Sequence, residues 1–182
     1  MRNLLPAVAT LLAACATPHS VAPREYLDEK TAATITVVAD PWVLASERSS
    51  ERDERDFLNL YAVDVNRQGE HRQYLAVLQW WPNPDVANGK VAPTLQLHAV
   101  DRTIALQTVA EDARALGIAQ PVAQSSGLGS KWWYFLVTKD ILADVAKTPE
   151  LRATLVVGDA QTRFSKWRDG SAELMQLTDE LP

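Results

Sequence analysis

The side chains that could carry out chemistry in this chain of 182 residues are few and far apart. There are three histidines and one cysteine, whereas metal and catalytic sites need such groups at a set spacing. His19, His71 and His98 share no metal-ligand spacing. No Gly-x-Ser-x-Gly nucleophile motif occurs, and no glycine-rich phosphate loop with its lysine. The sequence therefore predicts no metal and no cofactor, and a hydrolase ranks last among the candidate functions.

Two aspartates end segments that resemble each other. Residues 58–64 and 95–101 share the pattern Leu-polar-Leu-ring-Ala-Val-Asp, which is either a duplicated strand or chance reuse of a favourable one. We expect Asp64 and Asp101 to accept backbone hydrogen bonds where each strand turns, rather than to form a catalytic pair of carboxylates. Almost any sequence allows a triad to be drawn from His98, Asp101 and a serine, so a surface position for His98 is the simpler prediction.

Two pairs of adjacent tryptophans are the pattern most suited to a binding surface. They are Trp80 with Trp81, and Trp132 with Trp133. Adjacent side chains of a strand point to opposite faces of its sheet, so each pair should place one ring in the core and one outside it. Outward rings lying side by side would form a platform for sugar rings, peptides or another protein. The alternative is that both faces of the sheet are covered and the rings only fill volume.

The elements that must position these rings are mostly strands. Residues 57–65 and 73–81 are two long strand patterns around a turn containing Gly69, the strongest hairpin signal in the chain. Asp169-Gly170 favours a tight turn into a last strand at 171–177, where a helix is the alternative. Further strands are predicted at 34–38, 42–44, 95–99, 103–109, 131–138, 151–157 and 162–168, and short helices at 111–116 and 140–147.

These patterns predict a mainly β fold. We expect an antiparallel β-sandwich of about seven to nine strands with one or two short helices in its connections. A lipocalin-like β-barrel is the alternative. It is less favoured because the first tryptophan, Trp42, follows Asp40-Pro41 and lacks the Gly-x-Trp motif expected early in such a chain.

The first fifteen residues have the parts of a secretory signal. A cationic start is followed by an apolar run over residues 4–12, too short to span a bilayer as a mature helix, and then by Leu12-Ala13-Ala14-Cys15. This ending resembles the lipobox of bacterial lipoproteins. The resemblance implies a diacylglyceryl group on the Cys15 thiol, cleavage before Cys15, and acylation of the new amino terminus, for instance by palmitate. The absence of Asp after Cys15 implies transfer to the outer membrane, facing the periplasm.

The remaining organisation is simple. We expect a cleaved signal peptide at 1–14, the lipidated cysteine and a short tether at 15–32, and one β-rich globular domain at 33–182. The net charge of −5 argues against nucleic acid and against electrostatic adhesion to anionic lipid, so the membrane contact should be the lipid alone. The expected function is a non-enzymatic envelope lipoprotein that binds an envelope protein or a cell-wall component. The alternative is a small-ligand or glycan binder that uses the tryptophan pairs.

Overall fold

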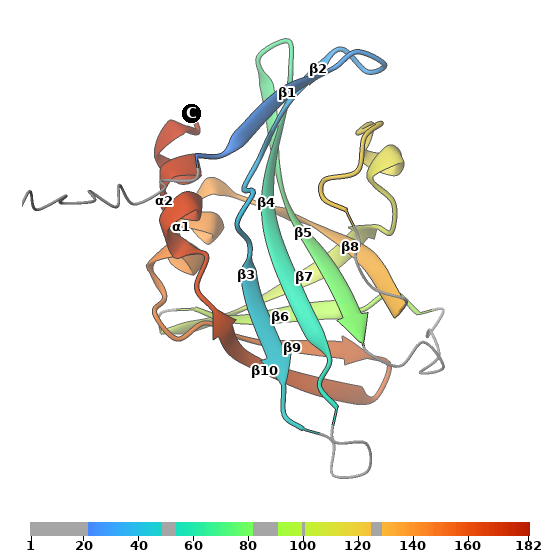
Figure 1. The fold of residues 1–182 in the computed structure, drawn as a ribbon, viewed down its shortest axis with the longest axis vertical. Coiled ribbons are helices and arrows are strands. Elements are labelled where there is room, and N and C mark those ends of the chain that lie inside the picture. The colour runs from blue at the N-terminus through green and yellow to red at the C-terminus, as the bar shows by residue number, and fades with distance from the viewer. Residues whose placement is uncertain (1–21, 49–53, 82–90, 100, 125–128) are drawn as a thin grey trace, which may run out of the picture.

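The computed structural model describes residues 22–48, 54–81, 91–99, 101–124 and 129–182 (Figure 1). Cys15 and the signal sequence lie outside the described residues. The described part contains ten strands, two α-helices and one 3-10 turn. These elements are β1 (Arg24–Asp28), β2 (Ala33–Val37), β3 (Trp42–Ser46), β4 (Phe57–Arg67), β5 (Glu70–Trp81), β6 (Thr94–Ala99), β7 (Arg102–Ala110), η1 (Ala113–Leu116), β8 (Gly129–Val137), α1 (Lys139–Lys147), β9 (Arg152–Val157), β10 (Ala160–Arg168) and α2 (Ser171–Glu180).

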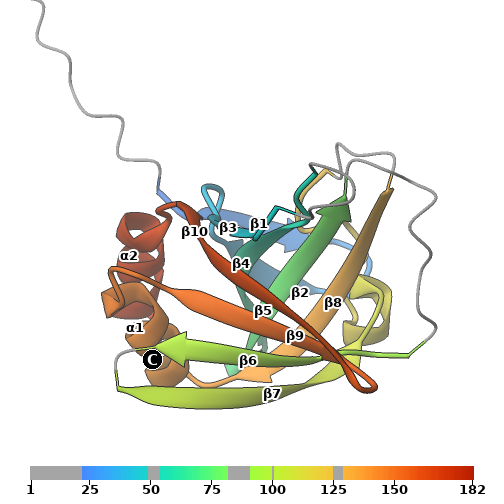
Figure 2. The ribbon, with the colours of Figure 1, turned by 90° about the horizontal axis from the view of Figure 1, so that it is seen from below.

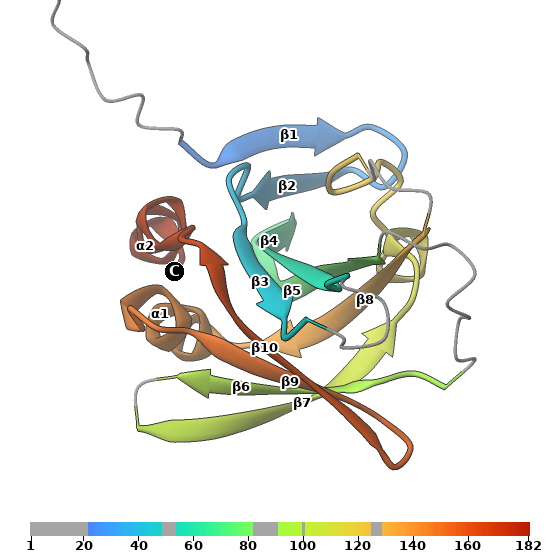
Figure 3. The same cartoon turned by 60° about the horizontal axis from the view of Figure 1, so that its bottom comes forward.

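Eight of the strands close into an antiparallel barrel. Around the ring the order is β4, β3, β10, β9, β6, β7, β8 and β5, and β5 pairs again with β4. Figure 3 shows these strands wrapping around a common interior. The predicted sandwich is therefore wrong, and the closed sheet agrees with the barrel alternative. Closure pairs both edges of all eight strands, whereas two separate sheets would leave edges exposed.

The β4–β5 hairpin is the longest pairing and confirms the strongest prediction. Its register runs from Phe57 opposite Trp80 to Arg67 opposite Glu70. Gln68 and Gly69, the two residues of the turn, both have positive φ angles, of 54° and 90°. This is the geometry of a type I′ turn, whose twist matches that of the flanking strands. The strands consequently extend further toward the turn than the predicted bounds.

Side chains of β4, β5 and β8 are buried on both faces of the sheet. On the inner face, residues such as Leu60, Val77 and Phe135 form the barrel interior together with apolar residues of α1 and α2. On the outer face, Tyr61 and Tyr134 belong to a second core, which includes residues from η1 and the segment after it. Figure 2 shows the two helices side by side at one end of the sheet. This double covering explains the apolar run of β8, in which Leu136 remains 54% exposed.

Two predicted segments differ in the structure. Residues 171–180 form helix α2 rather than the second strand of a hairpin. Leu174 and Leu177 are spaced for a helical face and both pack into the barrel interior. In addition, β1 lies within the segment predicted as a tether and pairs along its whole length with β2, so the ordered sheet begins at Arg24.

Asp28, at the end of β1, connects the β1–β2 hairpin to the segment after η1 through a hydrogen bond. Its side chain is buried, and Oδ2 accepts a hydrogen bond of 2.5 Å from the backbone N–H of Ala119. Oδ1 accepts a second one, of 3.1 Å, from the N–H of Lys30. The hydrogen bond from Ala119 is the main reason why the pKa of Asp28 lies below its ordinary value of 3.8, since burial alone would raise it.

We expect the free energy of unfolding to decrease in acid through Asp28. Because the folded-state pKa is lowered, the stabilisation is present above pH 3.8 and is lost as the pH falls through the folded-state value. The variant Asp28→Asn should be less stable near neutral pH and should show a weaker dependence on acid. Urea unfolding at several pH values measures this, with the exposed neighbour Glu29→Gln as the control. Equal acid dependence in the Asp28→Asn variant and the parent would contradict the assignment.

Candidate functional site

The strongest candidate site is a concave surface on the outside of the barrel. It crosses β10, β3, β4 and β5, which are consecutive around the ring. Its volume is about 430 Å³, within the range of about 300–1,000 Å³ typical of small-molecule sites. We call it the aromatic groove, and it is lined by Val43, Phe57, Asn59, Trp80, Trp167 and Arg168.

Strand register positions the three rings of the aromatic groove. Phe57 and Trp80 lie directly opposite each other on β4 and β5, and their rings stack at 4.2 Å with an angle of 10° between the planes. Trp167 joins them from β10, where a bulge lies between Lys166 and Arg168. Its ring is 6.0 Å from that of Phe57 and nearly perpendicular to it. Trp167 remains 61% exposed, so the groove presents a large aromatic surface to solvent.

Polar groups surround these rings. The indole N–H of Trp80 donates to Oδ1 of Asn59 at 3.2 Å, which fixes the orientation of both side chains. Arg168 forms an ion pair with Asp40 at 3.0 Å, and both side chains are about half exposed. The guanidinium of Arg55 lies 5.6 Å from the ring centre of Trp167, in a cation–π contact. The groove therefore combines aromatic faces with polar groups that are paired with one another or with a ring.

Tyr61 lies close to the polar side of the groove. Burial raises the pKa of its phenol, while a hydrogen bond from Asn59 and the charge of Arg168 act in the opposite direction. The charge of Asp40 adds a smaller upward effect. Tyr61 thus stays neutral near physiological pH, and its hydroxyl is electrostatically coupled to the Arg168–Asp40 pair.

Each predicted tryptophan pair has one ring inside and one outside the barrel. Trp133 is 3% exposed in the interior, where its N–H donates to Gln79 Oε1 at 3.1 Å. Trp81 is also buried, and a Cβ on Gly129 would lie only 2.4 Å from its indole nitrogen, so the position requires glycine. Trp80 and Trp132 are half-buried on the outer side.

The two outward rings do not form one platform. Trp80 stacks on Phe57, whereas Trp132 packs against Tyr61 and Tyr134 at 5.6 and 6.0 Å. Trp132 lines a separate pocket of about 430 Å³ beside η1. Charged groups of both signs surround that pocket, and one of them, Glu111, is already paired with Lys131 at 3.1 Å. Burial is the main reason why the pKa of Tyr134 is well above its ordinary range. Only one predicted ring, Trp80, is therefore part of the aromatic groove.

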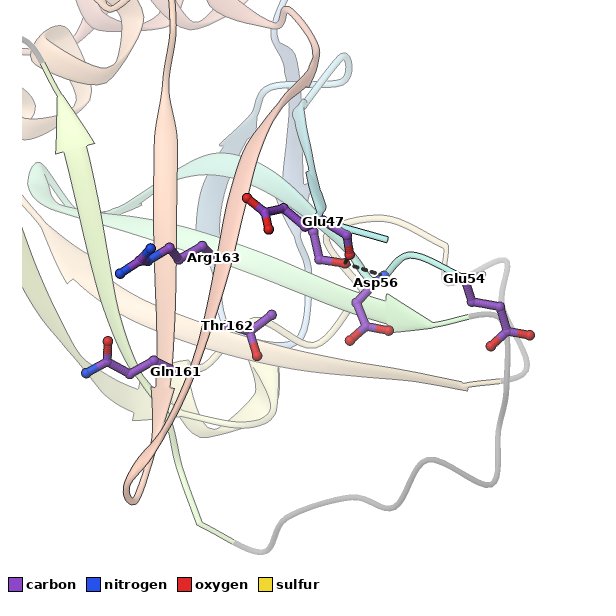
Figure 4. Close-up of a pocket in the computed structure, with 7 residues that line it drawn as sticks. Glu47, Glu54, Asp56, Gln161, Thr162 and Arg163 are labelled. Carbon is purple, nitrogen blue, oxygen red and sulfur yellow. Dashed lines mark hydrogen bonds between the residues drawn. The ribbon is translucent and has the colours of Figure 1, made fainter. Parts of the chain in front are cut away.

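A third hollow, of about 400 Å³, has an acidic lining (Figure 4). The carboxylates of Glu47, Glu54 and Asp56 point in different directions in that view, and Arg163 points away from them. The Asp56 backbone N–H donates to Ser46 Oγ at 2.9 Å, which closes the base of the loop. These carboxylates do not converge as a general acid and base would have to.

The histidine and aspartate candidates have structural partners. Asp64 is buried and accepts hydrogen bonds from His71 at 2.8 Å and from Gln73 at 2.9 Å, so its partners are side chains rather than the predicted backbone groups. Both ring nitrogens of His98 contact threonine hydroxyls, at 3.0 and 3.1 Å, which leaves neither nitrogen for a triad with Asp101. Within the described ranges, no three His, Cys, Asp or Glu side chains are grouped as metal ligands.

The sequence prediction missed two of the three rings in the aromatic groove. Phe57 could have been found from the predicted hairpin, because a short turn at residues 68 and 69 brings it opposite Trp80. Trp167 lies three positions after the core residue Phe164, and an odd spacing in a strand predicts opposite faces. That spacing indicates an outward ring but does not tell which strand lies beside it.

Helix α1 has nine residues and α2 has ten. In the described part of the chain, no helix is long and apolar enough to cross a membrane. Comparison of the chain with protein-family models, with curated proteins and with solved structures found no match.

Proposed function

We propose that this chain is a lipid-anchored protein of the bacterial cell envelope whose barrel is a non-enzymatic binding module. The aromatic groove is its recognition surface. The observation that carries the proposal is the exposure of Trp167 beside the stacked rings of Phe57 and Trp80. The resemblance of residues 12–15 to a lipobox supports the anchor on Cys15 and the location at the outer membrane, on the periplasmic side.

Physical arguments favour binding at this surface. A concave patch that exposes large apolar rings loses little conformational entropy on binding, because its side chains are already packed against each other. Tryptophan and arginine are also the residue types that most often dominate binding free energies. Trp80 and Trp167 with Arg55 and Arg168 provide two of each around one hollow.

The groove is better suited to holding a ligand than to transforming one. A general base needs a carboxylate or imidazole within reach of the substrate and free to take a proton. Asp40, the carboxylate beside the groove, is held by the guanidinium of Arg168. We therefore propose recognition of an envelope component without its chemical conversion.

The anchor can be tested through Cys15. The variant Cys15→Ser should move the protein from the detergent phase to the aqueous phase, because several acyl chains contribute about 0.8 kcal/mol for each buried methylene. Metabolic labelling with palmitate should mark the parent and not the variant. Membrane association that is unchanged in the variant would contradict the lipid anchor.

The recognition surface can be tested through Trp167. Immobilised protein should retain material from fractionated outer membrane and cell wall, and Trp167→Ala should weaken this retention at least tenfold, about 1.4 kcal/mol. Leu136→Ala is the matched control, since Leu136 is 54% exposed on β8 and lies outside the groove. Retention that is equal in the parent and the Trp167→Ala variant would remove the groove from the proposal.

A further inference from the structure

We infer that the aromatic groove binds a neutral, β-linked hexopyranose oligosaccharide, with one sugar ring stacked on Trp167 and its hydroxyls bound by the Arg168–Asp40 pair. This inference rests on the proposed function, because it names the ligand class of the same groove. It is carried by the combination of an exposed indole, an exposed ion pair beside it and a concave shape.

The indole of Trp167 provides the apolar half of the site. Arg55 lies over the ring, and its own guanidinium is held by a hydrogen bond of 2.9 Å to the Ser46 carbonyl. With 61% of the residue exposed, the ring still presents a wide surface to the groove. A hexopyranose with equatorial substituents has a flat face of C–H groups, and such a face packs well on the negative π surface of an indole. β-Linkage keeps successive rings extended, so that this face stays accessible along the chain.

The Arg168–Asp40 pair provides the polar half. Sugar hydroxyls are both donors and acceptors, and two neighbouring hydroxyls can receive an N–H from the guanidinium and donate to the carboxylate. Nη2 of Arg168 contacts Oδ1 of Asp40, and a guanidinium has five N–H donors, so the pair retains unused donors and acceptors. The side chains are 53% and 45% exposed, which makes both of them accessible to a ligand.

Charge and shape favour this sugar over two other ligands, a negatively charged molecule and a membrane surface. The Arg168–Asp40 pair is neutral as a unit, and the guanidinium of Arg55 is already engaged by the Trp167 ring and the Ser46 carbonyl, so hydroxyl groups suit the pair better than a fixed negative charge does. A membrane surface needs rings that protrude, whereas Trp167 forms one wall of a hollow and packs nearly perpendicular to Phe57.

The test uses the indole N–H signals of the full chain carrying Cys15→Ser. Six tryptophans give six such signals in a ¹⁵N-labelled sample. Titration with cellotetraose or chitotetraose should shift the signals of Trp80 and Trp167 and leave those of Trp42 and Trp133 unchanged. Maltotetraose, the α-linked comparator, should bind at least fivefold more weakly. Trp167→Phe identifies the signal of Trp167 by its loss and should retain part of the affinity.

Variants separate the two halves of the site. Trp167→Ala should weaken binding more than tenfold, and Asp40→Asn or Arg168→Gln at least fivefold, while Leu136→Ala should bind like the parent. Thermal unfolding of each variant shows whether the fold is retained. If Asp40→Asn fails to fold, Arg168→Gln alone decides the role of the pair.

Two results would overturn the inference. One is that no β-linked sugar shifts Trp80 or Trp167. The other is that vesicles of phosphatidylethanolamine and phosphatidylglycerol shift them instead, which would assign the groove to the membrane surface. If envelope material is still retained in a Trp167-dependent way while the sugars have no effect, the glycan inference fails and the proposed function stands. If the protein retains no envelope material and no sugar shifts the signals, the glycan inference and the proposed function both fail.

Discussion

Replacement of Trp133 by alanine is expected to lower the free energy of unfolding by about 3–5 kcal/mol. Trp133 is 3% exposed and lies opposite Val77 in the barrel interior, with Phe135 in the same cluster. Its removal leaves a large cavity and takes the donor from Gln79 Oε1. Urea unfolding followed by far-UV circular dichroism measures the loss, with the slope of the transition as a check on two-state behaviour.

Trp167→Ala is the matched control for this prediction. The chemical change is identical, but Trp167 is 61% exposed, so its loss should cost less than about 1 kcal/mol. The contrast also makes the binding experiments interpretable, because a variant that keeps its stability can lose only the contacts of the groove. Equal losses of stability at the two positions would mean that the inner and outer faces are wrongly assigned.

The sequence predicts the local pairings better than the closure of the sheet. The alternating apolar residues of 57–65 and 73–81, with Gly69 between them, are sufficient to predict the β4–β5 hairpin. Closure depends on pairs between strands far apart in the chain, such as β3 with β10 and β6 with β9. Alternation shows which face of a strand is apolar but does not name the strand beside it. The runs buried on both faces fitted a sandwich, and here the outer face is covered by the η1 segment instead.

The candidate site likewise depends partly on local alternation, which the sequence shows, and partly on long-range strand pairing, which it does not. The alternation of side chains predicted that one ring of the Trp80–Trp81 pair lies outside the core but not which one, and in β5 it is the half-buried Trp80. The presence of Trp167 in the same groove depends on the long-range pairing of β10 with β3 and on the bulge beside Lys166. A bulge adds one residue to one strand and redirects the side chains after it. No local pattern in residues 160–168 predicts that irregularity.

The C-terminal helix α2 is attached to the barrel by a buried carboxylate. Loss of this carboxylate is expected to lower the free energy of unfolding strongly. Glu173, in the first turn of α2, is only 4% exposed. Its two oxygens accept hydrogen bonds of 2.6 Å from the backbone N–H groups of Ala39 and Asp40, in the loop between β2 and β3. A carboxylate in the first turn of a helix also interacts favourably with the helix dipole.

Glu173→Ala is expected to lower the free energy of unfolding by about 2–4 kcal/mol, because it removes two hydrogen bonds to a buried carboxylate that hold α2 to the loop between β2 and β3. Glu173→Gln has almost the same shape, but its amide directs N–H groups at one of the two backbone N–H donors, so it should lose a substantial part of the same stability. The control is Asp179→Asn, which removes an acidic charge from an exposed position of α2 and should change stability by less than about 0.5 kcal/mol. Because Asp40 also pairs with Arg168 beside the aromatic groove, Glu173→Gln should in addition weaken oligosaccharide binding at temperatures where the variant stays folded. If Glu173→Gln were as stable as the parent, the two backbone hydrogen bonds would not hold α2 to the barrel.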